Sequence, residues 1–583
     1  MNTVEKPMYG WETINWGKAQ RYVFKLQKRI YRASERGDVK AVHKLQRLLT
    51  TSWYSKVLAV RKVTQDNQGK NTPGIDGVSR LRNHQKIKLA QKLKFNDKSG
   101  PTRRVWISKP GNEEKRPLGI PTIEERAKQA LLKMALEPEW EAKFEPNSYG
   151  FRPGRSAHDA ISAIFNGICQ KAKYVLDADI EKCFDRINHS KLLDKLQTSP
   201  TFRRQVKAWL KSGVMDGGKL FPTEEGTPQG GVISPLLANI ALHGMEEILE
   251  EKFSRRVGKN KAKRKVSFVR YADDFVLMDE SLEVILEAKA VIEEWLSEIG
   301  LTLKASKTRI THTLEEYEVK AGFNFLGFNI RQYPCSDKQS GSVGGTERKR
   351  GHKTLIRPSA EAIQKHLQKI DCLIQRSNAS TQEQLINALN PVIRGWAAYY
   401  STVASASTFD KMDSLLFQKL FGWAKRRRAR NQNNTDVVSN YWGVNRGLGW
   451  KFITQDNKYV LEKYAGTKIK RHVKVKKTRT PYDGDLIYWG QRLSQHPMLR
   501  NVAAKLLRKQ QGRCSECGLS FTSEDLLEVH HLDKDRSNNK TNNLILVHRH
   551  CHDVIHSARG TVTSQITEEP NEVKVSCSVL EER

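Results

Sequence analysis

The sequence has few acidic residues and few cysteines, and it contains no long apolar segment. Hydrophobic residues make up 38% of the 583 positions, and no run of about 18 apolar residues occurs that would cross a membrane. The first ten residues, Met1 to Gly10, lack the apolar core of a secretion signal. We therefore expect neither a membrane partner nor export, and the length predicts roughly three to five domains.

Acidic residues number 64 against 100 lysines and arginines, which gives a net charge of +36. A chain this basic repels itself unless a polyanion neutralises it, and nucleic acid does so with release of counterions. A single run of charge usually marks a solvated face, but here the excess extends over the whole chain. The composition therefore predicts a nucleic-acid-binding protein.

The eight cysteines are unevenly placed. Four are scattered, three lie close together near the C-terminus, and the last, Cys577, is in the tail. This clustering favours a metal site over disulfides and predicts a reducing, cytoplasmic environment. The scattered residues are Cys169, Cys183, Cys335 and Cys372, and the clustered ones are Cys514, Cys517 and Cys551.

Hydrophobic periodicity predicts a multidomain α+β protein. The expected strands are Tyr174–Ile180, Phe268–Met278 and Phe323–Ile330, and the expected helices include Ala19–Ala33, Val39–Val63 and Leu282–Ile299. A Gly/Ser-rich basic segment, Ser336–Lys353, is predicted to be a flexible loop or linker. The predicted parts are 1–335 with a helical extension at 1–70, then 354–435, 436–504, 505–560 and a poorly ordered tail at 561–583.

Two acidic motifs interrupt apolar strands. In Tyr271-Ala272-Asp273-Asp274, adjacent carboxylates lie between β-forming residues, which is costly unless a cation neutralises them. An ordinary acidic turn is the alternative. Alternation in a second strand places Asp177, Asp179 and Glu181 on one face. Carboxylates from the two motifs would converge on a pair of metal ions ~3.5–4 Å apart, and Mg²⁺ accepts such oxygen ligands.

These two motifs resemble the catalytic motifs of reverse transcriptases, and further blocks follow in that family's order. The resemblance covers about residues 70–335. The blocks are Arg116–Pro121, Ser148–Gly154, Gly226–Gly231, Ser234–Leu236, Gly300–Leu301, Ser306–Thr308 and Phe325–Phe328.

The resemblance implies a role for each matching residue. Asp179, Asp273 and Asp274 would be the catalytic carboxylates that bind Mg²⁺. Phe184 would exclude a ribose 2′-hydroxyl, with a plain core aromatic as the alternative. Four further residues would contact the nucleotide: Gln229 in its pocket, Arg116 and Lys115 at the triphosphate, and Lys307 at the leaving group. A plain surface lysine is the alternative for Lys307. Asp177 and Asp185 match no metal ligand and are expected either to be structural or to support the metal ligands from behind.

The segment Asn390–Tyr400 carries three aromatic residues beside Arg394. Spacing alone indicates helix packing, but the segment also resembles the maturase-specific region of group II intron proteins. That resemblance implies a helical thumb that helps to bind intron RNA. The basic run Lys425–Arg430 would contact phosphates without reading sequence, and position and charge predict a DNA-binding region at 436–504.

The C-terminal module contains two spaced pairs of metal-ligand residues. Cys514 and Cys517 form one pair, and His548 and Cys551 form the other, which is typical of a four-ligand structural zinc site. His550 is an alternative fourth ligand. Disulfide formation is the alternative reading of the thiols.

Histidines around these pairs resemble the HNH, or ββα-metal, nuclease motif. His552 and His556 share one helical face at i, i+4. The resemblance implies that these two residues and His530 hold a divalent cation, and that His531 is the general base for attack on DNA phosphate. Asn543 would fix the loop that orients His531, Glu528 also fits the motif, and the alternative is that all the histidines bind structural zinc.

Taken together, the motifs resemble group II intron-encoded proteins, which are reverse transcriptases and maturases with a C-terminal HNH endonuclease. The resemblance implies a right-hand polymerase fold, Mg²⁺ and Zn²⁺ as cofactors, and intron RNA, target DNA and dNTPs as partners. It also allows a homodimer. A bacterial cytoplasm is the expected location, with an organelle as the alternative.

Three other functions compete with this one. A reverse transcriptase of another element is disfavoured by the maturase-like segment, and a non-catalytic RNA chaperone by the intact Asp179, Asp273 and Asp274. A plain HNH homing endonuclease would not need the polymerase motifs.

Overall fold

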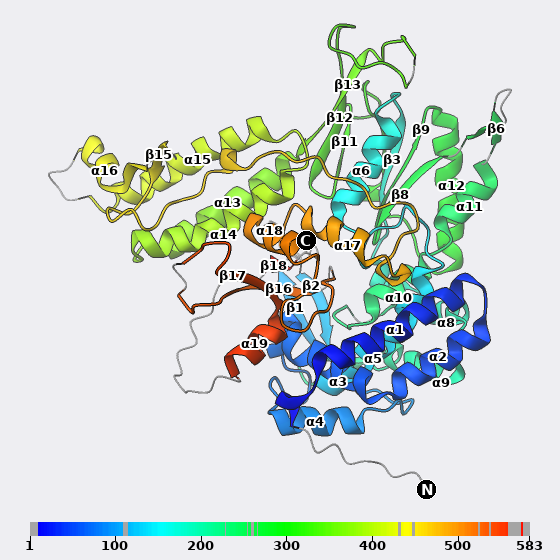
Figure 1. Cartoon of the computed structure of the whole chain (residues 1–583). Coiled ribbons are helices and arrows are strands. Elements are labelled where there is room, and N and C mark those ends of the chain that lie inside the picture. Colours follow the sequence, from blue (N-terminus) through cyan, green and yellow to red (C-terminus); the bar gives the residue numbers. More distant parts are fainter. Residues whose placement is uncertain are drawn as a thin grey trace.

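The structure, a computed structural model, has a mixed α/β multidomain architecture (Figure 1). It describes residues 10–108, 115–227, 229–253, 255–257, 262–264, 266–344, 346–428, 433–445, 449–522, 525–535, 538–557 and 573–574. Most of the predicted tail, 561–583, therefore lies outside the described residues, as do Ala429 and Arg430 of the basic run. Among the described helices, none has the length and apolar character needed to cross a membrane.

The N-terminal helices pack around α5 (Ile123–Glu141), which is buried along most of its length. They are α1 (Trp16–Glu35), α2 (Val39–Thr51) and α3 (Trp53–Arg61), and α4 (Asn83–Lys92) packs against α3. The helix expected at Val39–Val63 is broken at Ser52, whose backbone is extended (φ −63°, ψ 134°). Just before the break, the hydroxyls of Thr50 and Thr51 donate to carbonyls one turn back, a local bond that competes with regular helix.

Two antiparallel-rich sheets follow. The first has the strand order β10-β3-β9-β8, and the second has the order β2-β1-β4-β5. The strands of the first are β3 (Tyr174–Asp179), β8 (Ser267–Tyr271), β9 (Asp274–Asp279) and β10 (Arg309–His312). Those of the second are β1 (Thr102–Ser108), β2 (Lys115–Ile120), β4 (Val214–Asp216) and β5 (Lys219–Phe221). The segment expected as one strand, Phe268–Met278, is thus a hairpin of two.

Helices surround the first sheet and supply its apolar core. They are α6 (Ala157–Ile168), α7 (Cys183–Arg186), α8 (His189–Leu196), α9 (Pro200–Leu210), α10 (Ser234–Ala241), α11 (Met245–Phe253) and α12 (Leu282–Glu298). A short hairpin, β6 (Arg255–Val257) and β7 (Ala262–Arg264), follows α11.

A third sheet joins the polymerase-like part to a bundle of long helices. Its strands are β11 (Phe323–Phe325), β12 (Phe328–Pro334) and β13 (His352–Pro358), and the helices are α13 (Ala360–Arg376), α14 (Gln382–Tyr400) and α15 (Ala406–Lys425). The hydroxyls of Tyr399 and Tyr400 donate to the carbonyls of Leu326 and Gly327, each at 3.1 Å. These aromatics are buried, as helix packing requires.

The segment Ser336–Lys353 connects β12 to β13 within this sheet. Its described part is held by Arg350, whose Nη1 donates to the carbonyl of Cys169 at 3.1 Å. Because β13 pairs with β12 along its whole length, the segment is a hairpin loop and does not separate two domains.

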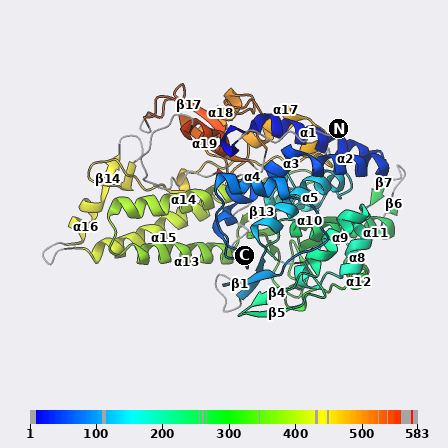
Figure 2. The same ribbon diagram turned by 90° about the horizontal axis from the view of Figure 1, so that it is seen from below.

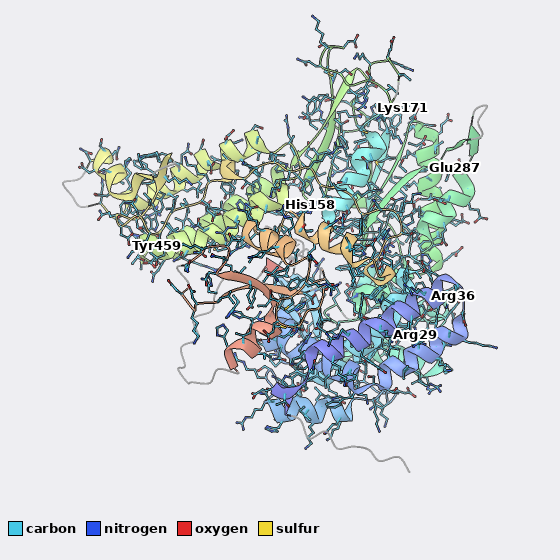
Figure 3. The ribbon with its side chains drawn as sticks, viewed as in Figure 1. Arg29, Arg36, His158, Lys171, Glu287 and Tyr459 are labelled. Carbon is cyan, nitrogen blue, oxygen red and sulfur yellow. The ribbon has the colours of Figure 1, made fainter. Side chains whose placement is uncertain are left out.

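After α16 (Asn434–Tyr441) and the hairpin β14 (Trp442–Asn445) and β15 (Gly449–Phe452), the chain runs back across α6. Asp159 of α6 anchors this return. It is fully buried and accepts bonds from Arg492 at 2.5 and 2.6 Å, from the Val475 amide at 2.8 Å and from His472 Nε2 at 3.1 Å. Beside it lies His158 (Figure 3), whose Nε2 is 2.8 Å from the Tyr399 carbonyl.

Replacing Asp159 with Asn is expected to weaken the attachment of residues 472–492 by about 3–5 kcal/mol, because Arg492 loses its buried counter-charge. Burial alone would raise the pKa of Asp159, but His472 and Arg492 outweigh it and hold that pKa well below its usual value. The stabilisation is therefore present above about pH 4 and is lost as pH falls. Hydrogen exchange of the Val475 amide measures the change.

The matched control is Asp194→Asn, which removes an exposed pair with Arg203. It is expected to change stability by less than about 1 kcal/mol. If Val475 exchanges at the same rate in Asp159→Asn as in the wild type, Asp159 is not the anchor.

The C-terminal module consists of β16 (Leu526–His531), β17 (Leu544–His548), α19 (Arg549–Ser557) and β18 (Val573–Lys574). Its apolar core also includes Leu506 and Leu507 of α18 (Asn501–Lys509), which follows α17 (Leu486–Ser494). The module lies against the N-terminal helices in both ribbon views (Figures 1 and 2). A Cβ added at Gly17 of α1 would lie 3.6 Å from Cys517 Cβ.

Candidate active sites

The first candidate site lies at one end of the β10-β3-β9-β8 sheet. The antiparallel register of β3 and β9 places Asp179 opposite Asp274. Asp273 precedes Asp274 in the β8–β9 turn, where Ala272 has a left-handed backbone (φ 57°). The structure therefore brings together the three carboxylates that the two motifs predicted to converge.

The electrostatics of this site favour a cation. Burial and the neighbouring Asp179 both raise the pKa of Asp273. Lys307 Nζ lies 2.7 Å from Asp179 Oδ2, and although burial opposes it, Asp179 raises the pKa of Lys307. Closely spaced carboxylates of this kind suit Mg²⁺, which takes hard oxygen ligands.

Asp177 has a different environment from Asp179 on the same strand. Arg309 Nε lies 3.3 Å from its carboxylate, and burial raises the pKa of Asp177 to about 6. The Asp177 carboxylate is thus paired with Arg309, a residue that no sequence pattern marked.

A glycine-rich loop presses against the helix that carries Phe184. At Gly226 (φ +80°) a Cβ would lie 2.5 Å from the Phe184 carbonyl oxygen, so only glycine fits there. The Phe184 ring lies 6.2 Å from Phe151 in an edge-on contact. In the same loop, Gln229 Nε2 donates to Asp185 at 3.3 Å. The loop that carries Gln229 therefore lies against the helix that carries Phe184.

The predicted phosphate-binding residues lie at the start of β2. Lys115 and Arg116 are exposed there. Burial raises the pKa of both Asp273 and Asp185, and the charge of Arg116 opposes that rise at each carboxylate. Arg104, on the adjacent β1, acts more strongly on Asp185. It was missed because its only sequence signal is a charge within a strand.

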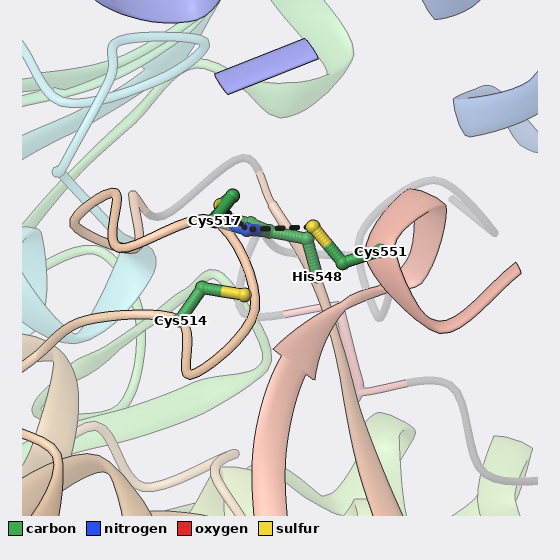
Figure 4. A group of neighbouring side chains, drawn as sticks. All are labelled: Cys514, Cys517, His548 and Cys551. Carbon is green, nitrogen blue, oxygen red and sulfur yellow. Dashed lines mark hydrogen bonds between the residues drawn. The ribbon is translucent and has the colours of Figure 1, made fainter. Parts of the chain in front are cut away.

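A second candidate site is formed by Cys514, Cys517, His548 and Cys551 (Figure 4). Their ligand atoms all lie within 4.8 Å of one another, and the three thiols are unbridged. His548 Nδ1 faces the sulfurs, 3.4 Å from Cys517 Sγ. Three thiols and one imidazole at this spacing fit the tetrahedral ligand set of structural zinc.

Two further residues lie beside this cluster: His550, which the sequence left as an alternative fourth ligand, and Asp525, for which it predicted no role. His550 is buried and stacks on His548 with ring centroids 5.0 Å apart, but it is not in the four-residue group. Asp525 Oδ2 lies 3.5 Å from His548 Nε2. A carboxylate on the second nitrogen fixes the orientation of a ligating imidazole.

A third candidate site groups His530, His552 and His556, whose ring nitrogens lie within 4.8 Å of one another. His552 and His556 approach through their Nε2 atoms at 3.2 Å. Glu528 Oε2 lies 2.7 Å from His552 Nδ1, which leaves Nε2 directed at the other histidines. The motif resemblance implied no definite role for Glu528, although alternation places it on the same strand face as His530.

His531 lies beside this group and not within it. Its Nε2 is 3.4 Å from Asn539 Oδ1. Asn543 braces the loop that follows: its Nδ2 donates to Asp533 Oδ1 at 2.8 Å, and its Oδ1 accepts from the Asp533 amide at 3.1 Å. Asn543 thus links the two ends of the loop that follows His531, the last residue of β16.

Four family models match the chain in sequence order. Residues 11–93 match the N-terminal domain of reverse transcriptase, and residues 107–330 match reverse transcriptase (RNA-dependent DNA polymerase). Residues 363–442 match the group II intron, maturase-specific domain, and residues 514–558 match HNH endonuclease.

Curated relatives agree with these matches. Protein YkfC of Escherichia coli (strain K12) is 32% identical over 329 residues, which is 50% of this chain and 83% of YkfC. The group II intron-encoded protein LtrA of Lactococcus lactis subsp. cremoris is 26% identical over 80% of this chain and 86% of LtrA. Maturase-like protein 1 of Euglena gracilis is 25% identical over 77% of this chain and 87% of its own length.

Proposed function

Because the chain belongs to the group II intron-encoded proteins, with reverse transcriptase, maturase and HNH endonuclease domains, we propose that its nuclease cuts target DNA to create the primer that its polymerase extends. The single observation that carries the polymerase half is the β3–β9 register, which sets Asp179 against Asp274. The nuclease half rests on the His530, His552 and His556 group.

In the polymerase, Asp179 and Asp273 would hold Mg²⁺, with Asp274 beside them. The bound metal supplies activation of the primer 3′-hydroxyl and charge neutralisation at the leaving pyrophosphate. Phe184 would bar a ribose 2′-hydroxyl, and Gln229 would line the dNTP pocket. Arg116 and Lys115 would bind the triphosphate, and Lys307, already next to Asp179, would balance charge on the leaving group.

In the nuclease, His530, His552 and His556 would hold a divalent cation, and Glu528 would orient His552. The cation supplies Lewis acidity at the DNA phosphate. His531 would take the proton from the attacking water, and Asn543 would keep its loop in place. Cys514, Cys517, His548 and Cys551 would bind a structural zinc ion that holds β17 and α19 to the preceding turn.

The finer architecture follows from the same assignment. The β10-β3-β9-β8 sheet would be the palm of a right hand, the β2-β1-β4-β5 sheet part of the fingers, and α13 to α15 the thumb. Strands β16 and β17 with α19 would be the ββα-metal motif. Exposed Lys425, Arg426 and Arg428 at the end of the bundle would contact intron RNA, and 436–504 would contact target DNA.

The proposal is tested with the protein bound to its intron RNA, on a duplex that carries the joined-exon sequence. His531→Ala is expected to lower strand cleavage at least about 100-fold and to abolish cDNA on the intact duplex. On a duplex nicked beforehand, the same variant should make cDNA as the wild type does. His84→Ala, at an exposed histidine of α4, is the matched control.

Undiminished cDNA from His531→Ala on intact DNA would mean that the nuclease does not supply the primer. Loss of cDNA on the nicked duplex as well would mean that His531 is needed for more than cleavage. In either case the coupling of the two activities would have to be abandoned.

A further inference from the structure

The turn that carries Asp273 has an unfavourable backbone conformation. Ala272 adopts φ 57° without being a glycine, which costs about 1–3 kcal/mol and persists only where the surroundings enforce it. The turn is also crowded, because a Cβ added at Gly150 would lie 2.3 Å from the Ala272 nitrogen. Something must therefore hold the turn and the Gly150 segment together.

Backbone bonds of Arg270 to the Asn147 carbonyl and from the Tyr149 amide join the two segments at one point. The side chains of Arg270 and Asn239 extend this attachment to the turn itself. Arg270 Nη1 donates to the Ala272 carbonyl at 3.1 Å and to Asn239 Oδ1 at 3.2 Å. Asn239 Nδ2 in turn donates to the Gly150 carbonyl at 2.9 Å. The two side chains thus connect the catalytic turn directly to the segment packed against it.

The Arg270 side chain is completely buried, and its counter-charge is buried as well. Glu145 Oε2 lies 3.9 Å from Arg270 Nη2 and 3.0 Å from His243 Nδ1. The Gly244 amide donates to Glu145 Oε1 at 2.5 Å. A buried ion pair does not by itself explain why an arginine is present, since replacing such a pair with apolar residues of similar volume often leaves a protein equally or more stable. The contact with Ala272 supplies another reason for placing an arginine here.

We propose that Arg270 is a positioning residue, which together with Asn239 holds the Tyr271–Asp274 turn in the conformation that presents Asp273 to a divalent cation. The inference rests on the proposed polymerase function. Arg270 does not touch the reacting atoms; it acts through the backbone of the turn. Losing it should free the turn and weaken cation binding, in the way that loss of residues behind metal ligands weakens metal sites about 10–100-fold.

The first test needs neither metal nor activity. Hydrogen exchange of residues 271–274 is compared in wild type, Arg270→Met and Asn239→Leu, both of which keep the approximate volume. We expect exchange at least about 10-fold faster in both variants. Arg126→Met is the matched control, because Arg126 is also buried and donates to two carbonyls, those of Gly69 and Thr72, away from the turn.

The second test measures cation binding directly and through activity. Binding of Mn²⁺ to the complex with a dideoxy-terminated primer and dNTP should weaken at least about 10-fold in Arg270→Met, and the Mg²⁺ concentration for half-maximal extension should rise equally. Arg270→Lys keeps one charged donor and should recover part of both. Saturating Mg²⁺ should restore much of the rate.

The proposal would be overturned if Arg270→Met exchanged at the turn as slowly as the wild type and bound Mn²⁺ equally well. A loss of thermal stability like that of Arg126→Met would then show that Arg270 is only a core residue. If Arg270→Met does not fold, Asn239→Leu and Arg270→Lys decide in the same way. If the wild type extends no primer, the polymerase function fails, while exchange and Mn²⁺ binding still decide whether Arg270 positions the turn.

Discussion

Replacing Asp273 with Asn is expected to lower cDNA synthesis at least about 1,000-fold, because a metal that stabilises the transition state by several kcal/mol loses a charged ligand and each 1.36 kcal/mol is a factor of ten. Primer extension on an RNA template with Mg²⁺ measures the effect. The same variant should still cut target DNA, since the three-histidine group lies in a separate module.

The matched control is Asp177→Asn. Asp177 lies two residues from Asp179 on the same strand, but its carboxylate is held by Arg309. We expect this variant to keep extension within about 10-fold of the wild type, at a cost mainly in stability. An equal loss of primer extension in both variants would show that the acids of this region are required in general. Full primer extension by Asp273→Asn would refute the assignment of the site.

Removing the predicted zinc ion is expected to unfold the C-terminal module while the polymerase stays folded. Structural zinc contributes about 10–16 kcal/mol to the free energy of folding of small metal-bound modules. This is as large as the whole free energy of unfolding of most domains. Cys551→Ser, or a strong chelator, should therefore abolish DNA cleavage and expose β16 to α19 to protease. Primer extension on a nicked duplex should persist, because the polymerase has its own apolar core.

Cys372→Ser is the control for the loss of a thiol, since Cys372 is exposed and far from the cluster in sequence. Comparing His548→Ala with His550→Ala identifies the fourth ligand. The geometry predicts loss of zinc only in His548→Ala. The opposite result would assign the position to His550, and stable cleavage in Cys551→Ser would rule out a structural role for the metal.

Local patterns in the sequence predicted much of this arrangement. The two acidic motifs and the family resemblance led us to expect Asp179 and Asp273 close together. Strand alternation fixes only the face that a side chain takes, and the β3–β9 register is what brings the acids to one end of the sheet. Spacing alone grouped His552 with His556, and Cys514 with Cys517. The family matches confirm the resemblance to group II intron-encoded proteins.

Contacts between distant segments were not predictable in this way. Asp159 and Arg492 are 333 residues apart, and neither residue type nor spacing marks them as partners. In the sequence, Arg270 is an ordinary charged residue within a strand, although its side chain is buried and bonds to the Tyr271–Asp274 turn. The break at Ser52 was missed because helical periodicity continues on both sides of it.

The shared core of α18 and the nuclease module affects how the nuclease can be inherited or moved between proteins. Leu506 and Leu507 of α18 share an apolar core with Phe521 and Leu546, so a division of the chain at Cys514 would expose apolar surface on both pieces. A transferable cassette must therefore begin upstream of α18, within a region that the sequence assigns to DNA binding. Gain or loss of the nuclease by recombination would then also alter that region, so cleavage and target choice would tend to change together.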